Sequence, residues 1–140
     1  MRISKTLNFA LTAAACLAVL QLGSCGQKKN ESAVPIIQSD TEFRALMADT
    51  TGKLVVFDLY ADWCQPCRML SPMLESIAQE NAGRVWLYKI NVDNFPAISR
   101  QFGVSGIPHV VFLKNGQVLR SLTGLNPREV YVQAIVDFTR

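Results

Sequence analysis

The sequence predicts an α/β domain in which a central mixed, mostly parallel β-sheet is flanked by helices. The first observation is that short β-like apolar runs alternate with segments of helical periodicity along residues 34–140, a pattern typical of a largely parallel sheet. The second is the Asn115-Gly116 pair between two strand-like runs, which predicts a hairpin that adds an antiparallel edge. With 140 residues, 49% of them hydrophobic and 18% charged, the chain has the composition of one packed domain.

The first expected elements are a short strand at 34–37, a helix at 41–48 and a strand at 54–60. Ser39 with Glu42 three residues later forms a capping box at the start of the helix. The strand at 54–60 is apolar apart from one aspartate, as expected for a central strand that is covered on both faces. The helix is expected to bury Phe43, Leu46 and Met47.

The second helix is expected to follow residues 61–67 and to end near Asn81 and Gly83. Apolar side chains recur in it at helical spacing, so one stripe should face the core. Pro72 lies inside this pattern and is expected to kink the helix. The stripe consists of Met69, Leu70, Met73, Leu74 and Ile77.

The remaining elements continue the alternation, and the whole order is β-α-β-α-β-α-β-β-α. The last helix is expected to pack through one apolar face. Its core side chains are Val130, Ala134, Ile135 and Phe138. The expected elements are a strand at 85–91, a helix at 95–102, strands at 109–114 and 117–123, and a helix at 127–139.

Residues 1–24 have the pattern of a secretory signal peptide, because a basic start precedes an apolar stretch and small residues. The stretch is shorter than the ~20 residues that a spanning helix needs. Leu22-Gly23-Ser24-Cys25 resembles the lipobox of bacterial lipoproteins, which implies acylation of Cys25 through its sulfur. An uncleaved membrane anchor, or ordinary cleavage with Cys25 a bystander, is the alternative. Residues 25–33 are polar and are interpreted as a flexible tether.

Cys64 and Cys67 form a C-x-x-C motif between a buried strand and a helix, which predicts redox chemistry. Unpaired N–H groups and the dipole at the helix N-terminus stabilise the Cys64 thiolate, which we expect to face outward. Cys67 lies one turn in, close enough to attack a mixed disulfide on Cys64, and Pro66 fixes the first turn. A structural zinc site would need a second pair of ligands, and only Cys25 and His109 could join the two cysteines. A purely structural disulfide would close too small a loop to constrain the unfolded chain much.

Trp63-Cys64-Gln65-Pro66-Cys67 resembles the W-C-G-P-C motif of thioredoxins, and the resemblance extends over about 105 residues from Val34 onward. Asp58, six residues before the first cysteine, matches the buried aspartate of that family. The resemblance implies a thioredoxin-like fold and a protein-disulfide oxidoreductase that needs no cofactor. The other matching positions are Pro72, Lys89, Ile107-Pro108, Asn115-Gly116 and Gly124.

The resemblance also implies roles for these residues. Cys64 is the nucleophile, Cys67 resolves the mixed disulfide, and Asp58 is the acid/base. On a buried strand Asp58 should have a raised pKa, and Lys89 would tune it. The alternatives are a paired core carboxylate for Asp58 and a solvated strand-end lysine for Lys89.

Five residues are expected to form the substrate surface. By resemblance, a cis bond precedes Pro108, and the backbone of this loop pairs with an extended substrate segment. Trp63 would shape that surface, although simple core packing is the alternative for it. The full set is Trp63, Gly106, Ile107, Pro108 and Gly124.

The sequence departs from the thioredoxin pattern at three places. Gln65 replaces the usual Gly, Tyr60 replaces a usual Trp, and His109 stands where Thr is common. Gln65, Pro66 and His109 are therefore candidates for tuning the redox potential, because a protonated imidazole could favour the thiolate. His109 could equally be an inert residue at the start of a strand.

Three functions follow from these features. The first is an exported, periplasmic, membrane-anchored disulfide reductase that acts on protein disulfides and is recycled by a membrane redox partner. The second is the reverse chemistry, a disulfide oxidant or isomerase for secreted proteins. The third is a non-catalytic binding module with the same fold. We expect a monomer, and no nucleic-acid binding, because the net charge of +3 comes with no Lys/Arg cluster.

Overall fold

The computed structural model of the chain describes residues 34–49 and 51–140. The predicted signal peptide, the lipidation site Cys25 and the tether at 25–33 lie outside the described residues. No helix in the described part is long and apolar enough to span a membrane. The elements are α1 (Asp40–Met47), β1 (Leu54–Tyr60), α2 (Gln65–Glu80), β2 (Val85–Asn91), α3 (Pro96–Gln101), β3 (His109–Lys114), β4 (Gln117–Thr123) and α4 (Arg128–Thr139).

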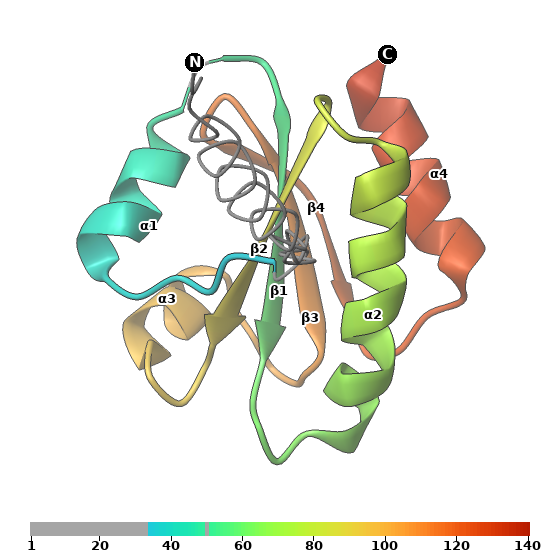
Figure 1. Cartoon of the computed structure of the whole chain (residues 1–140). Coiled ribbons are helices and arrows are strands. Elements are labelled where there is room, and N and C mark those ends of the chain that lie inside the picture. The colour runs from blue at the N-terminus through green and yellow to red at the C-terminus, as the bar shows by residue number, and fades with distance from the viewer. Residues whose placement is uncertain (1–33, 50) are drawn as a thin grey trace, which may run out of the picture. The chain divides into compact units, whose positions relative to one another are not determined.

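The four strands form one mixed sheet in the order β2-β1-β3-β4. Helices α1 and α3 cover one face, and α2 and α4 cover the other (Figure 1). The prediction of a mostly parallel sheet is wrong, because β1–β2 is parallel whereas β1–β3 and β3–β4 are antiparallel. Six residues of α3 rise only about 9 Å, too little to cross the sheet, so β3 starts at the end where β2 stops.

The strand predicted at 34–37 is reduced to a single parallel bridge between Ile36 and Lys89. The amide of Ile37 donates to the carbonyl of Lys89, and the amide of Lys89 donates to the carbonyl of Pro35, both at 2.9 Å. Pro35 has no N–H to extend the pairing, and Ser39 already caps α1. The segment therefore makes one bridge to the edge of β2 and stops.

The predicted N-cap of α1 is confirmed, since Ser39 Oγ accepts a hydrogen bond from the amide of Glu42 at 3.1 Å. The Glu42 carboxylate, however, accepts from the amide of Gln38 at 2.9 Å instead of from that of Ser39. The helix buries Phe43, while Leu46 and Met47 are partly buried against the same core cluster.

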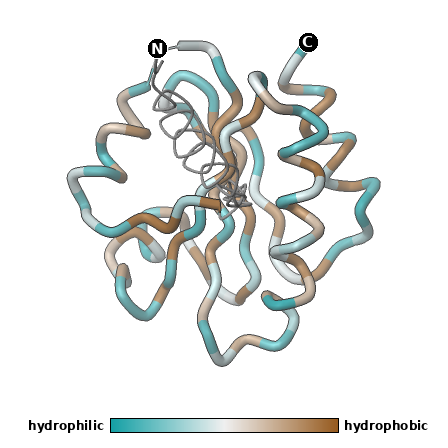
Figure 2. The backbone as a smooth tube through the Cα atoms, viewed as in Figure 1, coloured by the Kyte–Doolittle hydropathy of each residue, from teal (hydrophilic) through white to brown (hydrophobic). Residues whose placement is uncertain are grey.

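The core lies on both faces of the sheet, as the continuous apolar run of β1 predicts. Leu54 and Val56 pack with α2 and α4, and alternate residues of β1 pack with α1 and α3. Figure 2 shows the hydrophobic segments concentrated along the strands. Asp58 follows Val56 on the face that α2 covers. The strand therefore places a carboxyl group beneath the helix that carries the cysteines.

The stripe of α2 that faces the core is shifted from the predicted one. Met69 is 56% exposed, so its predicted burial is wrong, and Met73 is only partly buried. The buried stripe begins at Cys67 and includes a polar residue, and this spacing places Met69 outside the face. The helix continues through Pro72. Its buried residues are Cys67, Leu70, Ser71, Leu74 and Ile77.

Helix α4 buries Ala134 and Ile135 as predicted, but Val130 and Phe138 are only partly buried. The third buried residue, Tyr131, was not predicted, because its hydroxyl needs polar partners that sequence does not show. That hydroxyl donates to the carbonyl of Gly124 at 3.2 Å and accepts from the amide of Asn126 at 3.1 Å. Tyr131 thus anchors the loop between β4 and α4.

The hairpin between β3 and β4 turns at Asn115 and Gly116, as predicted. Both residues have positive φ, 52° and 73°, which is the requirement of a type I′ turn. At Gly116 a side chain is excluded for a second reason, because a Cβ would collide with the carbonyl oxygen of Met47. The turn therefore packs closely against the end of α1.

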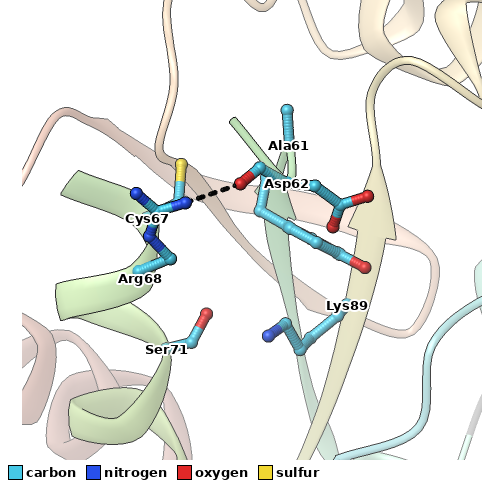
Figure 3. Close-up of a pocket in the computed structure, with 7 residues that line it drawn as sticks. Ala61, Asp62, Cys67, Arg68, Ser71 and Lys89 are labelled. Atoms are coloured by element: carbon cyan, nitrogen blue, oxygen red, sulfur yellow. Dashed lines mark hydrogen bonds between the residues drawn. The ribbon is translucent and has the colours of Figure 1, made fainter. Parts of the chain in front are cut away.

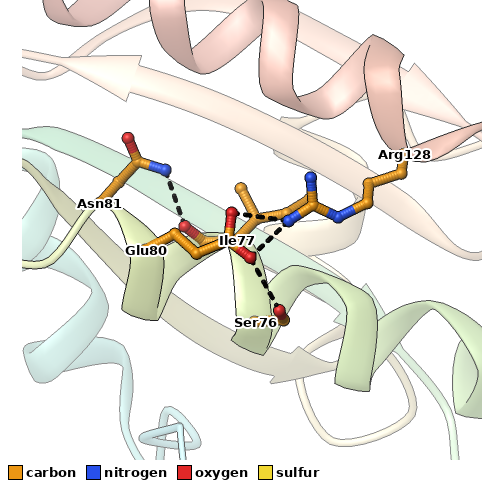
Figure 4. A network of polar contacts seen from close by, with 5 residues as sticks. All are labelled: Ser76, Ile77, Glu80, Asn81 and Arg128. Carbon is orange, nitrogen blue, oxygen red and sulfur yellow. Dashed lines mark hydrogen bonds and ion pairs between the residues drawn. The ribbon is translucent and has the colours of Figure 1, made fainter.

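An exposed ion pair joins the two helices that cover one face of the sheet. Arg128 of α4 donates to both carboxylate oxygens of Glu80 of α2, at 2.6 and 2.7 Å. Ser76 donates to the same carboxylate at 3.1 Å, and Figure 4 shows this network. Hydrogen bonds from Arg128 and Ser76 lower the pKa of Glu80. The pair is an exposed contact between α4 and α2, whose packing rests on the apolar core that the two helices share.

Candidate active site

The two cysteines of the C-x-x-C motif form a disulfide at the start of α2. The Cα atoms of Cys64 and Cys67 are 5.3 Å apart. Cys64 is the N-cap residue of the helix, and its sulfur accepts a hydrogen bond from the amide of Cys67 at 3.2 Å. Pro66 lies in the first turn, where an N–H would have no helical partner. The sulfur of Cys64 is thus held where backbone donors and the helix dipole stabilise a thiolate.

Both cysteines are buried in this disulfide form. Cys64 is 3% exposed and Cys67 is 1% exposed, so the expectation that Cys64 faces outward is wrong here. Ala61 is buried with them, and the partly buried Ile107 packs against the same cluster. Ile107 is 43 positions from Cys64 along the chain, so the C-x-x-C motif alone could not predict that this side chain packs against the disulfide.

The Pro108 loop lies beside the disulfide. The peptide bond between Ile107 and Pro108 is cis, as predicted. His109 pairs with Leu59 in the sheet, so the loop just before it reaches the end of β1, where the cysteines follow. The carbonyl of Pro108 accepts a hydrogen bond from the amide of Gly124 at 2.8 Å, which ties the loop to the end of β4.

Trp63 is exposed next to the disulfide. Its side chain is 69% accessible, which excludes the core-packing alternative, and its Nε1 donates to Asp93 at 2.9 Å.

Gly124 has a φ of +82° with open space around it, so the backbone conformation requires glycine there. At Gly106 a Cβ would meet Thr123 only at an ordinary 3.6 Å. The five predicted substrate residues therefore lie near the dithiol end of the sheet.

Asp58 is almost completely buried, at 1% exposure. One carboxylate oxygen, Oδ2, accepts a hydrogen bond from Ser71 Oγ at 2.8 Å, and Oδ1 has no partner within the described residues. Burial raises the pKa of Asp58, and the Glu75 charge adds to this, whereas the Ser71 hydrogen bond and the Lys89 charge lower it. The group is therefore suited to exchange a proton at a higher pH than an ordinary aspartate does.

Lys89 lies next to Asp58 on the neighbouring strand, because the two residues are partners in the parallel register. Its Nζ lies 4.6 Å from the centre of the Tyr60 ring, a cation–π arrangement. Burial raises the pKa of Tyr60, and the carboxylates of Asp62 and Asp58 raise it further. Lys89 thus supplies positive charge to the carboxylate that it was predicted to tune.

A pocket of about 390 Å³ opens between α2 and the ends of β1 and β2. In Figure 3, Cys67 and Ser71 line it from α2, and Lys89 enters from β2. A cavity of this size whose lining includes polar side chains can hold water. Its lining residues are Tyr60, Ala61, Asp62, Cys67, Arg68, Ser71 and Lys89. The inner cysteine therefore faces a space through which a proton can travel.

Gln65, the substitute for the usual glycine, is bound by Arg68. The Arg68 guanidinium donates to Gln65 Oε1, and also to the carbonyl of Asp62 at 2.8 Å. Sequence reasoning missed Arg68, although its position one turn into the helix would have placed it near Gln65. The pair holds the segment before the first cysteine against α2.

His109 is 4% exposed and lies on the sheet face opposite Asp58. Its Nδ1 is 2.8 Å from Thr123 Oγ1, and its Nε2 has no partner in the described part of the chain. Burial lowers the pKa of this imidazole, which disfavours the protonated form that the tuning hypothesis requires. The geometry favours the inert alternative.

Residues 34–49 and 51–140 contain no group of three or more His, Cys, Asp and Glu side chains that could hold a metal ion. In that region the chemistry-bearing groups that lie together are the disulfide, the buried carboxylate and the lysine beside it.

Comparisons with known proteins agree with this arrangement. The family model described as Thioredoxin matches residues 34–137. Thioredoxin from Alicyclobacillus acidocaldarius is 39% identical over 85 residues, which cover 61% of this chain and 81% of that protein. Chloroplastic thioredoxin M3 from rice is 41% identical over 81 residues, which cover 58% of this chain and only 46% of the rice protein. The thioredoxin structure from Malassezia sympodialis superposes with a TM-score of 0.69 at 34% identity, covering 76% of this chain and 91% of that one.

Proposed function

The chain belongs to the thioredoxin family, and from this membership we propose that it is a thiol-disulfide oxidoreductase that reduces disulfides in exported proteins. The observation that carries the proposal is the Cys64–Cys67 disulfide at the N-terminus of α2 with Asp58 buried beneath the same helix. A binding module alone would need neither the redox pair nor a buried carboxylate, whose charge is costly to keep in the core.

The reaction proceeds in two exchanges. The Cys64 thiolate attacks one sulfur of the substrate disulfide, which forms a mixed disulfide and releases the other substrate sulfur as a thiolate. The Cys67 thiolate then attacks the Cys64 sulfur, so the second substrate thiolate leaves and the Cys64–Cys67 disulfide forms. Two electrons pass to the substrate. Asp58 accepts the proton that Cys67 must lose before the second exchange.

The substrate binds in this proposal as an extended segment along the Pro108 loop. The packing of Ile107 against the disulfide and the exposure of Trp63 support this position. Backbone pairing of the β-addition kind gives affinity with little dependence on substrate sequence. Protein disulfides of many sequences are therefore the expected substrate class.

The direction of electron flow is testable by equilibrium titration of the dithiol against glutathione. We expect a reducing potential, below about −200 mV, since the family membership and Pro66 favour a reductant. A potential near or above that value is the range of isomerases and oxidants, and would establish the second function, the donation or exchange of disulfides in secreted proteins. The titration uses the domain itself, so its result does not depend on where the protein resides.

Export to the periplasm and anchoring through Cys25 are part of the proposal. The signal-like segment at 1–24 and the lipobox-like residues before Cys25 support them. A protein held there is out of reach of a cytosolic NADPH-dependent reductase. The recycling partner is therefore a membrane protein that carries electrons across the bilayer.

Cys25→Ser is expected to move the protein from the membrane fraction to the soluble fraction, because the sulfur that would carry the lipid is lost. Cys16→Ser is the matched control, since it removes a cysteine of the leader and should leave the protein in the membrane fraction. Immunoblots of the two fractions measure the distribution. An unchanged distribution for Cys25→Ser would contradict the lipid anchor.

A further inference from the structure

Ser71 is a polar residue in the buried stripe of α2, and the predicted chemistry did not use it. It is 8% exposed and lies four positions after Cys67, so both side chains project from the same face of the helix. A buried hydroxyl is costly unless it is hydrogen-bonded, and in helices it usually bonds back to the carbonyl four residues earlier. Here Ser71 Oγ instead donates to Asp58 Oδ2 at 2.8 Å.

Within the described residues, the Ser71 hydroxyl is the hydrogen-bond donor to the Asp58 carboxylate. The other oxygen, Oδ1, is buried and has no partner among the described residues. An aspartate side chain can rotate about two bonds, so a single strong hydrogen bond decides which oxygen points toward α2. Ser71 therefore fixes the orientation of the carboxylate relative to the helix that carries the cysteines.

Ser71 also lies between the carboxylate and the pocket. Cys67 and Ser71 both line the pocket, whereas Asp58 does not. Figure 3 shows the Ser71 hydroxyl and the Lys89 amine directed toward the same space. Ser71 therefore connects the buried Asp58 carboxylate to the space that Cys67 lines.

We propose that Ser71 is a positioning residue that favours the ionised form of the Asp58 carboxylate and orients it to take the proton of Cys67. The inference rests on the proposed function and deepens it. In the step concerned, the Cys67 S–H proton passes to Asp58, the Cys67 sulfur bonds to the Cys64 sulfur, and the substrate thiolate leaves with the electron pair of the broken bond. The proton on Asp58 later returns to solvent through the pocket.

Other charges around Asp58 do not replace this contact. Lys89 faces it from β2 and Glu75 from α2, with opposite effects on the pKa of the carboxyl group. Tyr60, Asp62 and Arg68 line the pocket nearby. These groups act through space, while the Ser71 hydroxyl is in direct contact with the carboxylate and favours its ionised form.

The first measurement is independent of activity. In the oxidised protein, a ¹³C NMR titration of the Asp58 carboxyl carbon should show a higher midpoint pH for Ser71→Ala than for the unmodified protein. Ser71→Thr keeps a hydroxyl and should restore the midpoint. Ser76→Ala removes an exposed hydroxyl of the same helix and should leave it unchanged. A midpoint that Ser71→Ala leaves in place or lowers would overturn the proposal.

The second measurement follows resolution of the mixed disulfide between Cys64 and thionitrobenzoate by stopped flow across pH. Ser71→Ala should resolve it about tenfold more slowly at acidic pH, the size expected for a lost hydrogen bond to a charged group. Its rate should recover at higher pH, because the acid limb of the pH–rate profile shifts to higher pH. A profile that is lowered equally at every pH would show a merely structural role. If the unmodified protein reduces no protein disulfide, the proposed function fails, whatever the Asp58 titration shows.

Discussion

Cys64→Ser is expected to reduce disulfide reductase activity to the background rate, whereas Cys67→Ser accumulates a mixed disulfide with the substrate. The Cys64 sulfur accepts a backbone hydrogen bond at the start of α2, so it is the sulfur best stabilised as a thiolate. Without Cys67, the second exchange has no nucleophile and the first product persists. Insulin reduction with dithiothreitol measures turnover, and non-reducing gels detect the trapped species.

The matched control is the double variant, in which neither turnover nor a trapped species is expected. Full turnover by Cys67→Ser would show that Cys67 does not resolve the intermediate. Trapping by Cys64→Ser instead of Cys67→Ser would exchange the two roles. The burial of both cysteines in the disulfide form does not decide between these outcomes, and the hydrogen bond to the Cys64 sulfur is what favours the first assignment.

The elements that sequence predicted well are those specified by local signals. The continuous apolar run of β1 and the Asn115-Gly116 turn determine their own structure, and the observed strands have the predicted bounds. The direction of β3 relative to β1 depends on how a short helix returns the chain, which is not a local property. The prediction of a mostly parallel sheet was therefore wrong, although the bounds of the four observed strands were right.

The same distinction holds for the site. Asp58 was identified by its resemblance to the buried aspartate of thioredoxins, six residues before Cys64 on an apolar strand, and the cysteines because their spacing has a chemical meaning. Ser71 carries no such signal, since a serine in a helix is ordinary. Only its place in the stripe after Cys67, together with a buried acid 13 positions earlier in sequence, makes it significant. Helical spacing alone places Ser71 on the same face as Cys67. Its contact with Asp58, however, depends on how α2 packs on β1.

Asp58→Asn is expected to stabilise the protein at neutral pH while it slows resolution of the mixed disulfide. The pKa of Asp58 in the folded state is raised above its ordinary value of 3.8, mainly by burial. The folded chain therefore holds this proton at pH values where the unfolded chain has lost it, and stability falls as pH rises from 3.8 through the folded pKa. Above that range the buried charge is a cost that asparagine removes, on the order of 1–3 kcal/mol.

Urea denaturation of the oxidised protein measures this effect at neutral pH and below pH 3.8. The advantage of Asp58→Asn should be present at neutral pH and vanish in acid, where the aspartate is protonated in both states. Asp137→Asn, which changes an exposed carboxyl on α4, should show no such dependence. An advantage that persists in acid would mean that packing, and not the buried charge, causes the gain.

Asp58→Asn should also slow resolution of the mixed disulfide, and this loss would explain why a carboxylate that lowers stability is retained. An asparagine can still accept the hydrogen bond of Ser71, so the fold loses little, but it cannot take the proton of Cys67. Resolution should therefore slow across the neutral range and lose its acid limb, since the group that titrates is gone. A variant that is more stable and slower would show that the buried carboxylate is kept at a cost in stability for its role in proton transfer. If Asp58→Asn were more stable and equally fast, the proton of Cys67 would have to reach solvent through the pocket without Asp58.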